Sequence, residues 1–439
     1  MSLQSTLVLI GTLIINFTLA FFWMQWKKIH PFIIRFEKYT PLLIIVTLLA
    51  TWAFIFLIYK FPISGDVVNF FIPQGKQAFS GSIPNRDFAS SYMPLFPYII
   101  GSIYFVWQDS RSLGLFFTIC ICIFFTLFFY FLRKKKIYAS DNSMLLTVGL
   151  LNSTVLILGI GYQQDECYIL LLIGFLLIAS VNKWDLFTGI IAGFTLVLTK
   201  STIIILLIPF LLLCEKKRDF LIGVSAITIP VLGLFLMLGF SPVMMLMGES
   251  TAIVPPSLIT NFRAIPPIYL FFTSKPLITY FLNISVLGIV GIFVIQKHIN
   301  YSFRNLLSLL IVIWLLFLIM SLKSLTSYRL LVIPFIPFVL DIYRQRWKSI
   351  PIYFSIYCSL VSIHTMFYED WNKITRTNPY FSMIPNDHLP QYIILTSIEF
   401  LIVYFEIVWI FFALKSITKN SDEQDVSNSM ASMTESATT

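Results

Sequence analysis

Charged residues are scarce in this chain of 439 residues. They make up 12% of it, against roughly a quarter in soluble domains. Apolar residues account for 58%, and the mean hydropathy is +0.86. A soluble globular protein is therefore excluded, and the composition predicts an integral membrane protein.

The chain also has few residues that bind metals or form disulfides. Its five cysteines fall in or beside apolar runs without the spacing of a disulfide framework or a metal site, and its four histidines are scattered. Asp66 has no second acid nearby, such as the partner in a D-x-D pair, which argues against a dedicated metal site. We therefore expect no cofactor and no metal.

Long apolar runs are abundant. Leu42–Tyr59, Leu113–Leu132 and Ile393–Leu414 each match the ~20 residues that a spanning helix needs. The runs are continuous, not alternating, so we predict an all-α polytopic bundle and no barrel. About thirteen transmembrane helices are expected, at 3–23, 40–60, 111–132, 143–161, 166–181, 186–199, 201–214, 220–240, 276–296, 305–322, 326–342, 350–366 and 392–415.

The basic residues predict the orientation. Lysines and arginines cluster after alternate spans, and cytoplasmic loops are enriched in them, which accounts for the net charge of +9 without a nucleic-acid partner. This places the N-terminus outside and the C-terminus inside, in a bacterial plasma membrane. Met93–Trp107 is apolar but only fifteen residues long, and counting it as a span would put Arg133–Lys136 outside. We therefore assign it to a helix on the outer membrane face.

Five regions follow from this layout. They are two N-terminal spans (1–60), one external loop with juxtamembrane helices (61–110), a first bundle (111–240), a C-terminal bundle with external loops (241–415) and a disordered cytoplasmic tail (416–439).

Isolated polar residues gather on the predicted outer side. Each has a plain structural interpretation: Asp66 can cap a helix, Arg86 and Asp87 can pair, Asp165 with Glu166 can mark the end of a span, and an arginine can snorkel. Lys200 differs, because an ionisable group within apolar sequence is a functional candidate by default. The full set is Asp66, Arg86, Asp87, Asp165, Glu166, Lys200, Arg263, Tyr328 and Arg329.

Taken together, these residues suit chemistry on a lipid phosphate. Lys200, Arg263 and Arg329 can hold a phosphate leaving group, and Asp66, where the loop begins, can serve as general base for a hydroxyl. Glu399 and Glu406 lie seven residues apart on one face of the last span. We expect both to face the bundle interior, without an assigned role.

Several motifs together resemble the GT-C superfamily, and most closely the branch that contains glycosyltransferase family 87. They cover roughly Asp66–Phe210, and the later stretch S-Y-R-L-L-V-I-P-F-I-P is also similar. The motifs are D-V-V-N-F-F, G-S-I-P-N-R-D-F, S-Y-M-P-L-F-P-Y, G-Y-Q-Q-D, and T-G-I-I-A-G-F-T-L-V-L-T-K-S-T.

The resemblance implies a membrane glycosyltransferase that uses a polyprenyl-phosphate sugar. Asp66 matches the family's catalytic base, and Asp66–Phe79 and Tyr92–Trp107 match juxtamembrane helices that shape the pocket. The chain departs from the family at Phe70 and Phe71, where a tyrosine is usual, at Asn85 of the P-Y-R-D motif and at Met93, where a proline is usual. It also has an extra span before the loop.

We therefore expect inverting transfer of a hexose, with mannose preferred, to a lipid, glycan or polymer hydroxyl on the outer face. The substrate-binding residues would be Arg86, Asp87, Tyr92, Asp165, Lys200, Arg263, Tyr328 and Arg329. Two alternatives stay open: a polysaccharide polymerase or ligase, whose loop arginines and histidines have a thin counterpart in Arg376 and His388, and a flippase for a lipid-linked sugar.

Overall fold

The computed structural model describes residues 3–137, 141–245, 253–297, 299–344, 346–377 and 388–436. These residues form helices and connecting turns, and the only β-type pairings among them are three isolated bridges. The prediction of an all-α chain is confirmed.

The helices of the first half are listed in chain order. They are α1 (Leu3–Ile33), η1 (Ile34–Tyr39), α2 (Thr40–Ala53), η2 (Phe54–Ile58), η3 (Val67–Phe71), α3 (Ile72–Phe79), α4 (Phe96–Val106), α5 (Arg111–Lys134), α6 (Asn142–Leu150), η4 (Val155–Gly161), α7 (Glu166–Val181), α8 (Asp185–Val197), η5 (Ser201–Ile203), α9 (Ile204–Leu213) and α10 (Lys217–Met237).

The second half continues with shorter helices and then long ones. They are α12 (Leu258–Asn261), η6 (Phe262–Ala264), α13 (Pro266–Ser274), α14 (Pro276–Gln296), α15 (Phe303–Met320), η7 (Thr326–Leu331), η8 (Ile333–Phe335), α16 (Ile336–Leu340), η9 (Asp341–Tyr343), α17 (Ile350–Thr377) and α18 (Leu389–Ser436).

Many of these helices can cross a membrane. Among the described residues, eight are long and apolar enough, or up to nine if α6 and η4, which meet at 58°, form one bent span. The chain is thus a polytopic helical membrane protein, as predicted. Shorter apolar helices occupy the other predicted spans, so the number thirteen stays a prediction.

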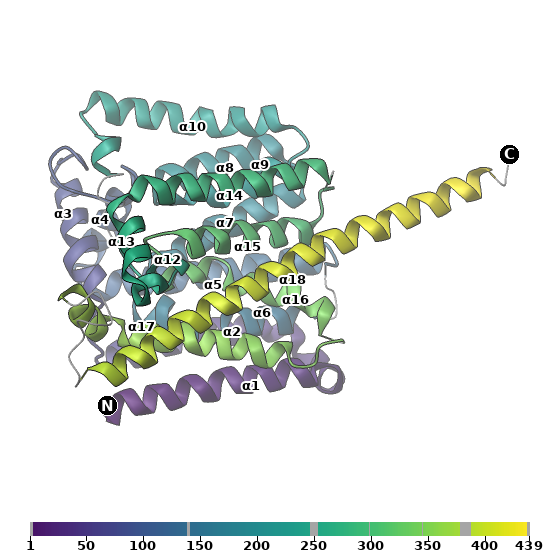
Figure 1. Ribbon diagram of the computed structural model, residues 1–439, viewed down its shortest axis with the longest axis horizontal. Coiled ribbons are helices and arrows are strands. Elements are labelled where there is room, and N and C mark those ends of the chain that lie inside the picture. Colours follow the sequence, from purple (N-terminus) through teal and green to yellow (C-terminus); the bar gives the residue numbers. More distant parts are fainter. Residues whose placement is uncertain are drawn as a thin grey trace.

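The long helices lie side by side, and two short ones cross one end of them. Figure 1 shows α3 and α4 at the end of the bundle where the N-terminus lies, running across the direction of the long helices. The C-terminus lies beyond the opposite end. At 11 residues, or about 16 Å, α4 is too short to span a bilayer. Helices therefore occupy both predicted juxtamembrane segments.

Glycines allow two close helix crossings. A side chain at Gly75 or Gly101 would collide with the backbone of the other residue, at 2.8 and 2.6 Å, so α3 and α4 touch at this point. Gly189 of α8 and Gly223 of α10 meet similarly. Small residues commonly allow such contacts between membrane helices.

A polar network attaches α1, the additional N-terminal helix, to the bundle. The buried Asn16 side chain donates to the hydroxyls of Ser153 and Ser359, at 2.7 and 2.8 Å, and accepts from the Ser153 amide at 2.9 Å. Its carbonyl accepts from the Ser355 hydroxyl. Ser153 lies at the bend between α6 and η4, where the Asn152 side chain accepts from two backbone amides. These bonds replace the backbone pairing that the bend interrupts.

The predicted disordered tail differs from the structure, in which α18 continues as a helix to Ser436. Figure 1 shows this part projecting away from the bundle. Residues 416–436 contain neither proline nor glycine, so no residue that breaks helices ends the last span.

Candidate functional site

Asp66 begins the helical part of the first loop and stays accessible. Its side chain is exposed, and its Oδ2 accepts a hydrogen bond of 3.1 Å from Nε2 of the buried Gln164. Its other carboxylate oxygen has no hydrogen-bond partner among the described residues. Asp66 is thus an exposed carboxylate that one side-chain hydrogen bond connects to the buried Gln164.

Three π-helical segments border this region. They are η2 and η3, which precede and follow Asp66, and η4, which ends just before Gln164. Such segments are rare and are found often at functional sites.

Lys200 lies in a break between two helices. After α8 ends at Val197, the backbone of Lys200 is extended, with φ −103° and ψ 148°, before η5 and α9 resume the helix. The amides of Met93 and Leu95 donate to the carbonyls of Thr199 and Val197, at 2.8 and 3.3 Å. The loop thus supplies hydrogen bonds that the interrupted helix lacks.

The Lys200 ammonium group makes two buried ion pairs. Its Nζ lies 3.0 Å from Oδ1 of Asp165 and 2.8 Å from Oε1 of Glu166, and all three side chains are at most 7% exposed. The second oxygens of both carboxylates, Asp165 Oδ2 and Glu166 Oε2, are buried without a hydrogen-bond partner. One cation therefore serves two carboxylates that are only partly satisfied.

Two tyrosines enclose the ammonium group. Nζ lies 5.3 Å from the centre of the Tyr92 ring and 4.9 Å from that of Tyr328, both within the range of cation–π attraction. The Tyr92 hydroxyl donates to Asp165 Oδ1 at 3.3 Å. We call Tyr92, Asp165, Glu166, Lys200 and Tyr328 the Lys200 cluster.

Gln164 joins the Lys200 cluster to Asp66. It precedes Asp165 in the chain and donates to Asp66, so an exposed carboxylate stands beside a buried, ion-paired one. Such a site has a base that can take a proton from an incoming hydroxyl. It also has a desolvated cation, whose interactions with an anion are stronger than in water.

Arg86 and Asp87 lie elsewhere in the loop and pair with each other. The Arg86 guanidinium donates to both Asp87 oxygens, at 2.8 and 2.7 Å, and to the Leu238 carbonyl at the end of α10. The hydrogen bond from Arg86 and a second from the Ile83 amide lower the pKa of the Asp87 carboxyl to about 2. This pair holds the loop against α10.

Arg263 and Arg329 contact two glutamates of α18, Glu399 and Glu406. Arg263 lies 2.6 Å from Glu399, and Arg329 lies 2.6 Å from Glu406, with every side chain at most 6% exposed. Arg329 also donates to the carbonyls of Pro256, Ser324 and Leu325. The two glutamates do face the interior, as predicted, and they act as counter-ions for the two arginines.

The structure thus brings together only part of the predicted set. Asp66, Tyr92, Asp165, Lys200 and Tyr328 meet at one place, whereas the other four residues do not join them directly. Tyr328 precedes Arg329 and so connects the Lys200 cluster to the Arg329–Glu406 pair. Gln164 was missed, although it stands next to a candidate acid in G-Y-Q-Q-D.

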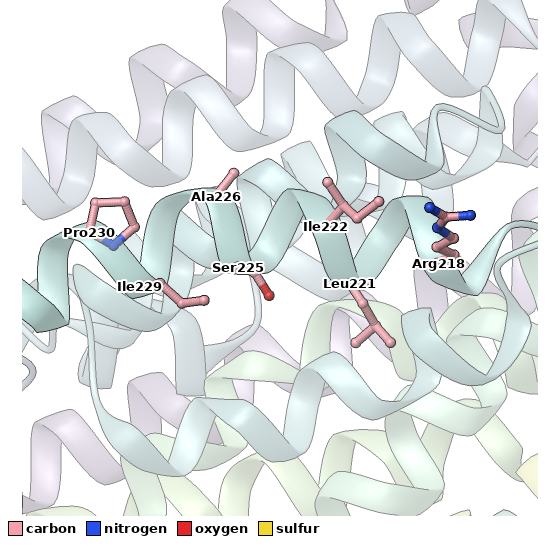
Figure 2. Close-up of a pocket in the computed structure, with 7 residues that line it drawn as sticks. All are labelled: Arg218, Leu221, Ile222, Ser225, Ala226, Ile229 and Pro230. Atoms are coloured by element: carbon pink, nitrogen blue, oxygen red, sulfur yellow. The ribbon is translucent and has the colours of Figure 1, made fainter.

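The described residues do not provide what a metal site needs, and a pocket lies apart from the Lys200 cluster. Over those residues, no three His, Cys, Asp or Glu side chains come together as a metal site would require. The hollow in Figure 2 is lined by α10 alone, from Arg218 to Pro230. His388 contacts Gln391 on the surface, and the Arg376 side chain lies outside what the structure describes.

Comparison with known proteins gives little further information. No family model matches the chain, and no curated protein matches its sequence. One similar solved structure is the crystal structure of ArnT from Cupriavidus metallidurans bound to undecaprenyl phosphate, with 10% sequence identity, a TM-score of 0.49 and coverage of 88% of this chain and 79% of that one.

Proposed function

We propose that this protein is a membrane glycosyltransferase of the GT-C type that transfers a sugar from a polyprenyl phosphate to an acceptor hydroxyl. The observation that carries the proposal is the position of Asp66. It is an exposed carboxylate, held by Gln164 beside the buried Lys200 cluster at the end of the bundle where α3 and α4 lie. The motif resemblance to family 87 assigns the base to the same residue.

In this reaction Asp66 accepts the proton of the acceptor hydroxyl. The hydroxyl oxygen forms a bond to the anomeric carbon, while the bond from that carbon to the phosphate oxygen breaks and leaves its electron pair on polyprenyl phosphate. A single displacement of this kind inverts the anomeric centre. Asp165 and Glu166 add negative charge near a carbon that becomes electron-poor in the transition state.

Lys200 is connected to Asp66 by two contacts. It pairs with Asp165, and Gln164, the residue before Asp165, donates to Asp66. We therefore assign the departing phosphate to Lys200. Because it contacts two carboxylates, it must exchange one of them for a phosphate oxygen. Arg263 and Arg329 can contribute only through a similar exchange with Glu399 and Glu406. Tyr92 and Tyr328 position Lys200, and Arg86 with Asp87 holds the loop on the acceptor side.

The finer parts of the proposal concern the substrate and the place of the reaction. We propose a hexose, with mannose preferred, and a lipid, glycan or polymer acceptor. We place the site on the outer face of the membrane, because basic residues favour the cytoplasmic side and the basic clusters lie in the segments opposite to the loop. We propose that this membrane is a bacterial plasma membrane.

An assay with radiolabelled polyprenyl-phosphate sugars tests the proposal. Purified protein in vesicles is given mannose, glucose, galactose or arabinose donors with candidate acceptors. Transferred label is expected with the wild type, and Asp66→Asn should abolish transfer without changing the melting temperature. Asp109→Asn is the matched control, because Asp109 lies in the same loop but pairs with Arg111. Near-normal transfer by Asp66→Asn would refute the assignment, and label that only crosses the bilayer would indicate a flippase.

A further inference from the structure

A cavity of about 610 Å³ opens between α1, η1, α2 and α6. Its volume lies within the ~300–1,000 Å³ that is typical of ligand pockets. It is lined mainly by apolar side chains. Among them are Leu19, Phe22 and Trp26 of α1, Leu43 and Ile44 of α2, and Leu151, which directly follows α6. Because α1 and α2 are themselves apolar enough to cross a membrane, the cavity is suited to a hydrocarbon chain.

The segment that frames this cavity is strongly basic. Residues 27–38 carry four basic side chains and one carboxylate, a net charge of +3. The basic residues Lys27, Lys28, Arg35 and Lys38 all have exposed side chains. Lys38 Nζ lies 4.9 Å from the centre of the Tyr39 ring, and Tyr39 lines the cavity. A positive rim therefore borders an apolar interior.

The lining also contains two ionisable side chains, His30 and Glu37. Nε2 of His30 is buried and has no hydrogen-bond partner among the described residues. The one carboxylate of the segment, Glu37, instead accepts a hydrogen bond of 2.8 Å from the Ser143 hydroxyl, which fixes its position. His30 is thus the available ring nitrogen between the apolar interior and the basic rim.

We propose that this cavity holds one acyl chain of an anionic phospholipid, with the lipid phosphate at the basic rim. The charge of the rim selects the anionic headgroup, since a juxtamembrane Lys or Arg contributes about 1 kcal/mol near an anionic surface. The lipid belongs to the membrane leaflet at the end of the bundle opposite to α3 and α4, because α1 runs from the N-terminus at their end toward residues 27–33. The site is separate from Asp66 and does not depend on the proposed activity.

Native mass spectrometry of the purified full chain tests this proposal. The protein is titrated with phosphatidylglycerol or with phosphatidylcholine of identical acyl chains, and the bound lipids are counted. One phosphatidylglycerol should bind at least about tenfold more tightly than phosphatidylcholine. Equal retention of the two lipids would overturn the proposal.

Two variants locate the site. Thr147→Phe places a ring in the cavity, so lipid binding should be lost. The Thr147 hydroxyl that is removed donates to the Ser143 carbonyl of the same helix. The protein should therefore still fold. Arg35→Gln with Lys38→Gln removes two rim charges and should weaken phosphatidylglycerol about tenfold or more. The control is Arg133→Gln with Lys134→Gln, a basic pair in the last turn of α5 and outside the segment 27–38. If Thr147→Phe retains the lipid, or if the control pair has the same effect as the rim pair, the proposal is wrong.

Discussion

The amide of Met93 donates to the carbonyl of Thr199 at 2.8 Å. This bond connects the external loop that contains Asp66, at a point just before α4, with the break that contains Lys200. A displacement of the loop at Met93 should therefore also move the backbone next to Lys200. The exposed carboxylate of Asp66 and the buried ammonium group of Lys200 therefore belong to connected segments.

Removal of Lys200 should destabilise the protein strongly. Lys200→Met leaves Asp165 and Glu166 buried without their cation, and breaking a buried pair in this way costs about 3–5 kcal/mol. The triple variant with Asp165→Asn and Glu166→Gln should regain much of that loss, because no uncompensated charge stays buried. Melting temperatures in detergent measure both effects.

The control for this comparison is Lys183→Met, which removes the cation of a pair whose side chains are 59% and 52% exposed. Exposed pairs contribute about 1 kcal/mol or less. Equal losses in Lys200→Met and Lys183→Met would mean that the Lys200 cluster is hydrated in solution.

The contact between α3 and α4 should be needed for transfer. Gly101→Leu drives a side chain into the Gly75 backbone, since even a Cβ atom would lie 2.6 Å from that carbonyl oxygen. The two helices must then separate, so transfer should fall sharply in the radiolabel assay. Gly288→Leu on α14 meets nothing within 4 Å and should behave as wild type. Full transfer by Gly101→Leu would show that this crossing is not required.

The Arg329–Glu406 pair should show strong thermodynamic coupling. Arg329→Met leaves a buried glutamate, and it also removes the guanidinium donors of the Pro256 and Ser324 carbonyls. Glu406→Gln alone leaves a buried guanidinium. The double variant should be more stable than the sum of the two losses predicts, by at least about 1 kcal/mol. Additive losses in a denaturation series would show that the pair does not interact in solution.

The Arg86–Asp87 pair should hold the loop over the whole physiological pH range. Its folded-state pKa is lowered to about 2, so the ion pair contributes stability above the ordinary carboxyl pKa and loses it as pH falls through about 2. Asp87→Asn should therefore speed hydrogen exchange in residues 83–88 equally at about pH 5 and about pH 8. A difference that disappears between these two values would contradict the assignment of the shift to Arg86.

The helices could be predicted because long apolar runs form helices in a membrane. Each of the thirteen expected spans does contain a described helix. The position of Met93–Trp107 followed from charge, and helix α4 is indeed too short to cross. The partners of the polar residues could not be predicted in this way. Glu399 and Arg263 are 136 residues apart, and Glu406 and Arg329 are 77 apart, and no local periodicity connects such distances.

The site was predictable to a similar extent. Asp66, Asp165 and Lys200 were found because an ionisable residue beside or within apolar sequence is costly and therefore noticeable. Gln164 and Asn16 are uncharged, so they carried little signal, although their amides make the decisive contacts. Arg263 and Arg329 were expected to bind a phosphate, whereas in the structure each forms an ion pair with a glutamate.

The network around Asn16 has a consequence for the order of synthesis. Asn16 is synthesised before its partner Ser359, which lies 343 residues later in the chain. Until α17 has been made, part of the Asn16 side chain has no such partner in the lipid, where an unsatisfied amide is unfavourable. The hydrogen bonds that hold α1 in its final position can therefore be completed only after α17 has been made.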